Sequence, residues 1–210
     1  MKTGTVSLLL LIASGAPLAG QDYYPRHNFT IGGGVARPRG DLGVSLDDAP
    51  GFAIGYGYRF QRYLQADIGF DSVFGAASVH DFLNTGLGPL KITDREYFLP
   101  FGGRAIAPFA RGRFLLSGGA GGVWMKYHER LSQPGEDLHI DCPECMARSG
   151  WGWYALANAS GFLDSGRHFR VGVTARMIRG NTEGEPLGGV PPFQTKDHWL
   201  TLGGEFGFSF

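Results

Sequence analysis

Cys142 and Cys145 form a C-x-x-C unit, Cys-Pro-Glu-Cys, which is the pattern in this chain that comes nearest to a chemical motif. Such a unit builds a redox centre, half of a zinc site or a local disulfide. The strand-to-helix setting of a thioredoxin-like centre is absent. A zinc site needs about four ligands; His128, His139 and Asp141 are near in sequence, but the chain has no second C-x-x-C unit. In an oxidising compartment the unit predicts a disulfide that pins a loop, with a metal half-site and free thiols as alternatives.

A histidine two residues before a serine would suit nucleophilic chemistry on a strand, because the two side chains share a face and the base reaches the hydroxyl. The chain has 6 His, and none is followed two places later by Ser. The glycine runs at 32–34 and 118–122 lack the Gly-Lys-Ser/Thr ending of a phosphate-binding loop. We therefore predict no enzyme, no cofactor and no metal; a triad assembled from separate strands is the alternative.

Charged residues recur on one face of strand-like segments whose other face is apolar. They are Arg59, Asp67, Asp71, Arg104, Arg176 and Glu205. If this face is enclosed, the charges must pair, because an unpaired buried charge is costly. We expect a network in which the arginines meet the carboxylates; the sequence does not assign the partners.

The N-terminal segment is organised like a secretory signal peptide. Lys2 supplies the positive region, Val6–Ala13 is a short apolar stretch, and small residues follow. The apolar stretch is too short to span a membrane as a helix. We expect a signal peptide over 1–20 and one domain over 21–210.

Composition narrows the class of protein. The chain has 35 Gly, 16 Phe and a formal net charge of zero. Without a basic excess, nucleic acid is not an expected partner. Glycine weakens ordinary strands, but it suits a barrel wall in which curved strands pack closely around a crowded interior.

The last segment, 199–210, alternates large apolar residues with small or polar ones, and Phe206, Phe208 and Phe210 share its apolar face. Similar segments precede it, with lengths near the roughly ten residues of a tilted transmembrane strand. The eight predicted strands are 28–35, 52–60, 64–71, 96–107, 112–127, 151–157, 169–177 and 199–210. Pro100 lies inside the fourth and predicts a bulge or a shifted boundary there, because proline lacks a backbone donor.

Short and long connections alternate between these segments. The short ones lie at 61–62, 108–111 and 164–167, and the long polar ones at 38–50, 72–95, 128–148 and 179–197. Outer-membrane barrels have short periplasmic turns and longer extracellular loops. Four tryptophans at strand ends beside long loops predict an aromatic belt at the outer membrane interface: Trp124, Trp151, Trp153 and Trp199.

With this pattern of strands, connections and terminal aromatics, the chain resembles the small eight-stranded outer-membrane barrels, the OmpA transmembrane domain and OmpX group within the outer-membrane β-barrel domain family. The resemblance implies an all-β, eight-stranded antiparallel up-and-down transmembrane barrel in the bacterial outer membrane, with four long extracellular loops. It also implies that the assembly machinery reads Phe206, Phe208 and Phe210 during insertion. The other implied partners are membrane lipid, lipopolysaccharide and an unknown ligand of the loops, for a monomeric protein.

An eight-stranded barrel has an interior just wide enough for side chains to fill. We therefore expect a structural or surface-interaction scaffold whose lumen is closed to ions. The alternatives are a narrow carrier of small hydrophobic molecules, like the OmpW relatives, and an outer-leaflet lipid A-modifying enzyme. A soluble secreted barrel would turn its large apolar residues inward, which the Phe-rich terminal strand argues against.

Overall fold

A computed structural model of the protein describes residues 24–44, 46–76, 83–85, 88–132, 139–140, 147–184 and 194–210. The predicted signal peptide over 1–20 and the pair Cys142 and Cys145 lie outside these described residues. The domain division and the disulfide therefore stay predictions.

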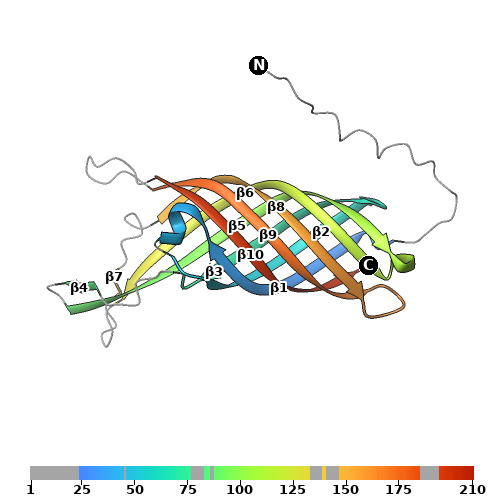
Figure 1. Ribbon diagram of the computed structural model, residues 1–210, viewed down its shortest axis with the longest axis horizontal. Coiled ribbons are helices and arrows are strands. Elements are labelled where there is room, and N and C mark those ends of the chain that lie inside the picture. Colours follow the sequence, from blue (N-terminus) through green and yellow to red (C-terminus); the bar gives the residue numbers. More distant parts are fainter. Residues whose placement is uncertain are drawn as a thin grey trace, which may run out of the picture.

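Eight long strands form one closed antiparallel barrel (Figure 1). They are β1 (His27–Pro38), β2 (Ala49–Gln61), β3 (Leu64–Phe74), β5 (Gly88–Phe109), β6 (Phe114–Ser132), β8 (Ala147–Phe162), β9 (Phe169–Gly184) and β10 (Gln194–Ser209). Each pairs with its neighbours in chain order, and β10 pairs back with β1, which closes the ring. The predicted all-β, eight-stranded antiparallel fold is confirmed.

The two ends of the barrel differ. At one end, here called the turn end, short connections join β2 to β3, β5 to β6 through the 3-10 turn η2 (Ala110–Gly112), and β8 to β9. The other end, the loop end, carries the 3-10 turn η1 (Gly40–Val44) and two short strands, β4 (Leu83–Thr85) on β5 and β7 (His139–Ile140) on β6 (Figure 1). Within the described part of the chain, no helix has the length and apolar character needed to cross a bilayer.

The chain terminus takes part in closing the barrel. The backbone N–H of His27 donates to the carbonyl oxygen of Phe210 at 2.8 Å, and the N–H of Phe210 donates back at 3.0 Å. The side chains of Phe206, Phe208 and Phe210 all lie exposed on the outside. Their placement fits the predicted apolar face of the last strand, while their reading by an insertion machinery stays a prediction.

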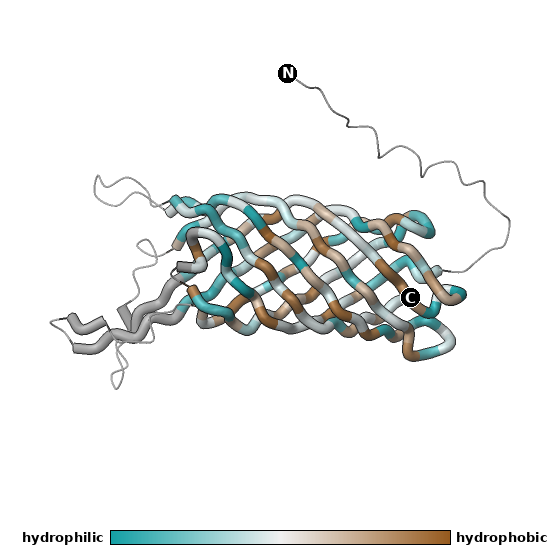
Figure 2. The backbone as a smooth tube through the Cα atoms, viewed as in Figure 1, coloured by the Kyte–Doolittle hydropathy of each residue, from teal (hydrophilic) through white to brown (hydrophobic). Residues whose placement is uncertain are grey.

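The barrel wall is apolar on its outer face. Strand side chains alternate between the two faces, so every second residue points away from the lumen, as Ile68 and Val173 do with exposed fractions of 60% and 65%. Other exposed outward residues include Phe29, Ile54, Phe101, Leu116, Val171 and Leu202. Figure 2 shows hydrophobic residues spread along the wall and hydrophilic residues gathered at the two ends.

Pro100 lies inside β5 without the bulge or shifted boundary that the sequence predicts. β5 passes through it in continuous register with β6. Its register with β3 is the same on both sides of a short gap, with Ile68 opposite Phe101 and Asp71 opposite Phe98. Because proline has no N–H to donate, the ladder to β3 is interrupted while the strand keeps its place.

Paired glycines let the strands approach and leave room in the lumen. Gly102 faces Gly121 across β5 and β6. A Cβ atom on Gly102 would lie 2.3 Å from the backbone oxygen of Ala120 and 2.8 Å from the hydroxyl of Tyr154. A side chain there would displace the tyrosine, which explains why glycine suits this wall despite its low strand propensity.

A layered lumen as the candidate functional site

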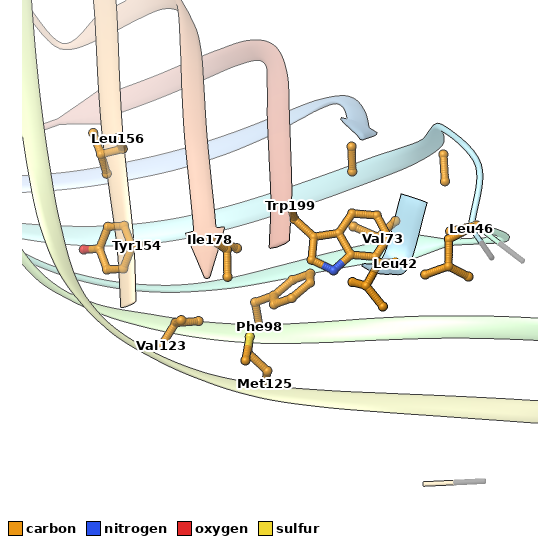
Figure 3. Packing of buried hydrophobic residues seen from close by; sticks show 13 residues of the cluster. Leu42, Leu46, Val73, Phe98, Val123, Met125, Tyr154, Leu156, Ile178 and Trp199 are labelled. Carbon is orange, nitrogen blue, oxygen red and sulfur yellow. The ribbon is translucent and has the colours of Figure 1, made fainter. Parts of the chain in front are cut away.

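The loop end of the lumen is filled by an apolar cluster. Its members include Trp199, Phe98, Met125, Ile178, Val73 and Leu42 (Figure 3). Trp199 is 1% exposed, and its ring lies 6.2 Å from that of Phe98. Leu42 and Leu46, in and just after η1, join this cluster, so the first connection packs across the mouth of the barrel. The apolar contacts anchor η1 there.

Trp199 corrects one sequence prediction. It was expected in an aromatic belt at the membrane interface, but it points into the lumen. The reason is parity: on β10 it shares a face with the inward Glu205 rather than with Phe206 and Phe208. Trp151 and Trp153 lie on the outside with exposed fractions of 64% and 46%, and Trp124, half-buried, faces Trp151 in register. Their role at a membrane interface stays a prediction.

The middle of the lumen holds ion pairs. Arg104 Nε lies 2.9 Å from Asp67 Oδ2, and each side chain is only 11% exposed. Asp67 also accepts a hydrogen bond of 2.6 Å from the Gln65 amide. Arg176 pairs with Asp71. Since β9 and β3 are four strands apart round the ring, this second pair spans the lumen.

The carboxylate of Glu205 has a partner that sequence reasoning missed. Arg170 Nε lies 3.9 Å from Glu205 Oε1. Arg170 also donates to Asn28 Oδ1 at 2.8 Å and to Ser209 Oγ at 3.0 Å, which links β9 to β1 and β10. The alternation of β9 already put Arg170 on the polar face, and that signal could have identified it.

Arg59, the remaining member of the predicted network, lies inside the barrel near the turn end and is 5% exposed. No ion pair among the described residues includes it. Its guanidinium carbon lies 5.9 Å from the ring centroid of Tyr24, and its Nε has no hydrogen-bond partner within the described structure. The structure thus brings five of the six predicted charges into pairs and leaves Arg59 apart from them.

A small internal cavity lies beside the ion pairs. Its volume is about 70 Å³, and its lining includes Gly55, Asp71, Pro100, Arg104 and Tyr154. Glycines and small residues form much of the wall, while the apolar cluster lies toward the loop end. The arrangement leaves a void inside a packed lumen rather than an open passage.

The described histidines show no catalytic pairing with serine. His27 Nδ1 lies 2.8 Å from the hydroxyl of Tyr56, and His168 Nδ1 lies 3.1 Å from Asp164 Oδ2. Within the described ranges, no cluster of three or more His, Cys, Asp or Glu side chains could hold a metal ion. The absence of enzymatic activity stays a prediction.

Comparison with known proteins gives matches of fold. No protein-family model and no curated protein sequence matches the chain. Neisserial surface protein A is similar in structure, with a TM-score of 0.51 and 12% identity over 88% of this chain and 97% of that one. OprG from Pseudomonas aeruginosa matches with a TM-score of 0.51 and 13% identity over 89% and 98%. Ail, the attachment invasion locus protein of Yersinia pestis, crystallised with the heparin analogue sucrose octasulfate, matches with a TM-score of 0.51 and 16% identity over 89% and 100%.

These similarities, together with the closed ring of strands, define the class of the protein. It is a small eight-stranded all-antiparallel barrel with the architecture of bacterial outer-membrane proteins. Identities this low support the shared fold alone. The narrower resemblance to the OmpA and OmpX group stays a prediction.

Proposed function

We propose that this protein is a bacterial outer-membrane barrel that serves as a structural or surface-interaction scaffold. The observation that carries the proposal is the outer face of the closed barrel, where Ile68, Leu202 and Val173 are among many exposed apolar side chains. An apolar surface this extensive is an aggregation liability in water, whereas lipid solvates such a band on a barrel. Membrane lipid and lipopolysaccharide are therefore its proposed surroundings.

In this proposal the turn end faces the periplasm and the loop end faces outward, because outer-membrane barrels keep their short turns on the periplasmic side. The long connections at the loop end are the parts available to a partner outside the cell. The packed lumen supports a scaffold rather than a pore. No described histidine pairs with serine, so we assign no catalytic role, such as lipid A modification, and no cofactor.

Delivery to the outer membrane tests this proposal. We expect Phe210→Asp to lower the amount of protein in the outer-membrane fraction about tenfold or more, because the terminal aromatic is proposed to be read during insertion. The readout is membrane fractionation combined with the mobility shift between unheated and heated samples in SDS.

The matched control is Phe114→Asp, which changes another exposed aromatic at the turn end outside the last strand. It should reach the membrane far better than the Phe210 variant. Equal delivery of both variants would contradict the proposed signal, and wild-type protein that remains soluble in the periplasm would contradict the membrane location itself.

A second candidate function, a narrow carrier of small hydrophobic molecules, is favoured by one observation. The internal cavity of about 70 Å³ borders Gly69 and Pro100, where the ladder between β3 and β5 is interrupted. A carrier predicts faster uptake of a small hydrophobic solute by cells that contain the protein than by cells that lack it. The scaffold predicts equal rates.

A further inference from the structure

The turn end of the barrel opens into a basin lined by arginines. Four arginines line it, each on a different element: Arg59 in β2, Arg62 in the turn after β2, Arg111 in η2, and Arg167 in the turn between β8 and β9. The basin has a volume of about 390 Å³. Its other described lining residues are Tyr24, Pro25, Ile106, Pro108, Gly112, Leu115 and Phe162, none of which is acidic. These residues are called the arginine basin below.

Arg59 forms the floor of the arginine basin. It is buried there without an ion-pair partner among the described residues. The side chain is 5% exposed, and its Nε lacks a hydrogen-bond partner within the described structure. Its nearest buried arginines, Arg104 and Arg170, are each paired with a carboxylate. Burial of a cation without an anion is unfavourable, so a negative group bound beside Arg59 would stabilise the site.

The two turns that hold the rim of the basin are fixed to each other. The Arg167 Nη2 atom donates a hydrogen bond of 2.6 Å to the backbone oxygen of Arg111. Both residues have left-handed backbone conformations, with φ of 60° at Arg167 and 58° at Arg111. Such angles are uncommon outside glycine and are kept only where the surroundings hold them. The rim is therefore a built feature that presents arginines at defined positions.

We propose that the arginine basin binds a phosphate group. A guanidinium offers parallel N–H donors that match the oxygens of phosphate, and several of them around one cavity neutralise its charge. The cavity supplies what a phosphate requires: a buried cation at the floor, further cations at the rim and no competing carboxylate in its described lining.

Two sources supply this chemistry, namely a phospholipid headgroup and a soluble phosphate. The outer wall beside the basin carries an apolar groove of about 500 Å³, lined by Phe109, Phe114 and Leu116 among others, and Leu115 lines both the groove and the basin. An acyl chain in the groove and a headgroup phosphate in the basin would belong to one lipid molecule. The inference concerns a ligand site and stands independently of the scaffold role.

Titration of the purified full-length barrel in neutral detergent tests the proposal. The probes are inorganic phosphate and dihexanoyl phosphatidylglycerol, each followed by calorimetry and by thermal unfolding. We expect saturable binding of at least one probe. Tight binding of the lipid with weak binding of phosphate assigns the site to a headgroup, and equal binding assigns it to soluble phosphate. Absence of saturable binding of both probes overturns the proposal.

Variants locate the site. Arg59→Gln should weaken binding tenfold or more and should not lower the thermal stability of the phosphate-free protein, because an unpaired buried charge is removed. Arg111→Asn, on the rim, should weaken binding several-fold and serves if the first variant does not fold. The matched control is Arg179→Gln, an exposed arginine toward the loop end of β9, which should bind within twofold of wild type. If the control variant lost as much phosphate affinity as the basin variants, the effect would come from the net charge of the protein. That result would overturn the proposed site.

An acidic residue close in sequence to the basin provides a further control. Asp22 precedes Tyr24 and lies outside the described residues. Asp22→Asn should leave phosphate affinity within twofold of wild type. An increase of tenfold or more would show that the chain fills the basin with its own carboxylate, and this result would overturn the proposal.

Discussion

At the scale of single residues, the pair formed by Arg176 and Asp71 gives the clearest stability prediction. Both side chains are largely buried, at 17% and 12% exposed. Asp71→Ala leaves the arginine without its partner in the lumen, which should destabilise the barrel by about 3–5 kcal/mol. Thermal or denaturant unfolding in detergent measures the loss.

Two controls accompany this prediction. Asp48→Ala removes the exposed partner of Arg37 and should change stability little, because solvent screens such a pair. The double variant Asp71→Ala with Arg176→Ala should recover much of the loss, since no unpaired charge then remains. A double variant as unstable as Asp71→Ala alone would contradict the ion-pair explanation.

Sequence reasoning predicted six charges inside the barrel, but it missed Arg170 and did not predict which of the charges meet. The alternation of side chains along a strand tells which face a residue is on, but it does not tell which residues of the opposite strand it meets. The contact between Arg176 and Asp71 depends on the tilt and stagger of the closed ring, which no local pattern contains. For Trp199 the local pattern was sufficient but was not followed. The alternation of its strand places the side chain inside the barrel, whereas the prediction relied on its position beside a long loop.

At the scale of elements, the turn between β8 and β9 is stabilised by one carboxylate. Asp164 accepts hydrogen bonds from the backbone N–H groups of Phe169 at 2.8 Å and of His168 at 3.0 Å. These bonds lower the pKa of Asp164 from its ordinary value of 3.8 to about 2, and the bond from Phe169 has the largest effect.

A pKa lowered by folding means that the ionised carboxylate stabilises the turn. The stabilisation is complete above the ordinary pKa of 3.8 and is lost as the pH falls through about 2. Hydrogen-exchange protection of the amides of His168 and Phe169 should therefore decline over this range in the wild type. In Asp164→Ala the protection should be low and independent of pH; a similar decline in that variant would assign the effect to another group.

The sequence predicted the positions of the strands but not all of their ends. The predicted segments fall within the observed strands except near the short turns, but several strands extend beyond them toward the loop end; β5 begins at Gly88 rather than near Glu96. In this extension β5 pairs with β6 through backbone hydrogen bonds, and these require no alternation of side chains.

Pro100 was expected to distort β5. Its inward ring instead lies near Gly69, where an added Cβ atom would be 3.3 Å from the proline Cγ.

At the scale of the whole molecule, three features lie in series along the lumen. The apolar cluster around Trp199 fills the loop end, the ion pairs of Arg104 and Arg176 lie in the middle, and the arginine basin opens at the turn end. The internal cavity beside the ion pairs has a volume of only about 70 Å³. We therefore expect no continuous path for hydrated ions among the described residues, and the wild-type barrel should be closed to ions.

Planar-bilayer recordings check this prediction. Wild-type protein should give no steps of porin size, and Trp199→Ala should remain silent, because the ion pairs still obstruct the middle of the lumen. Adding Asp71→Ala and Arg176→Ala to that variant also removes the ion pair that spans the lumen and should produce measurable steps if it folds. Folding is established first by the mobility shift on heating. Steady porin-sized conductance of the wild type would contradict the packed lumen and would favour a passage over a scaffold.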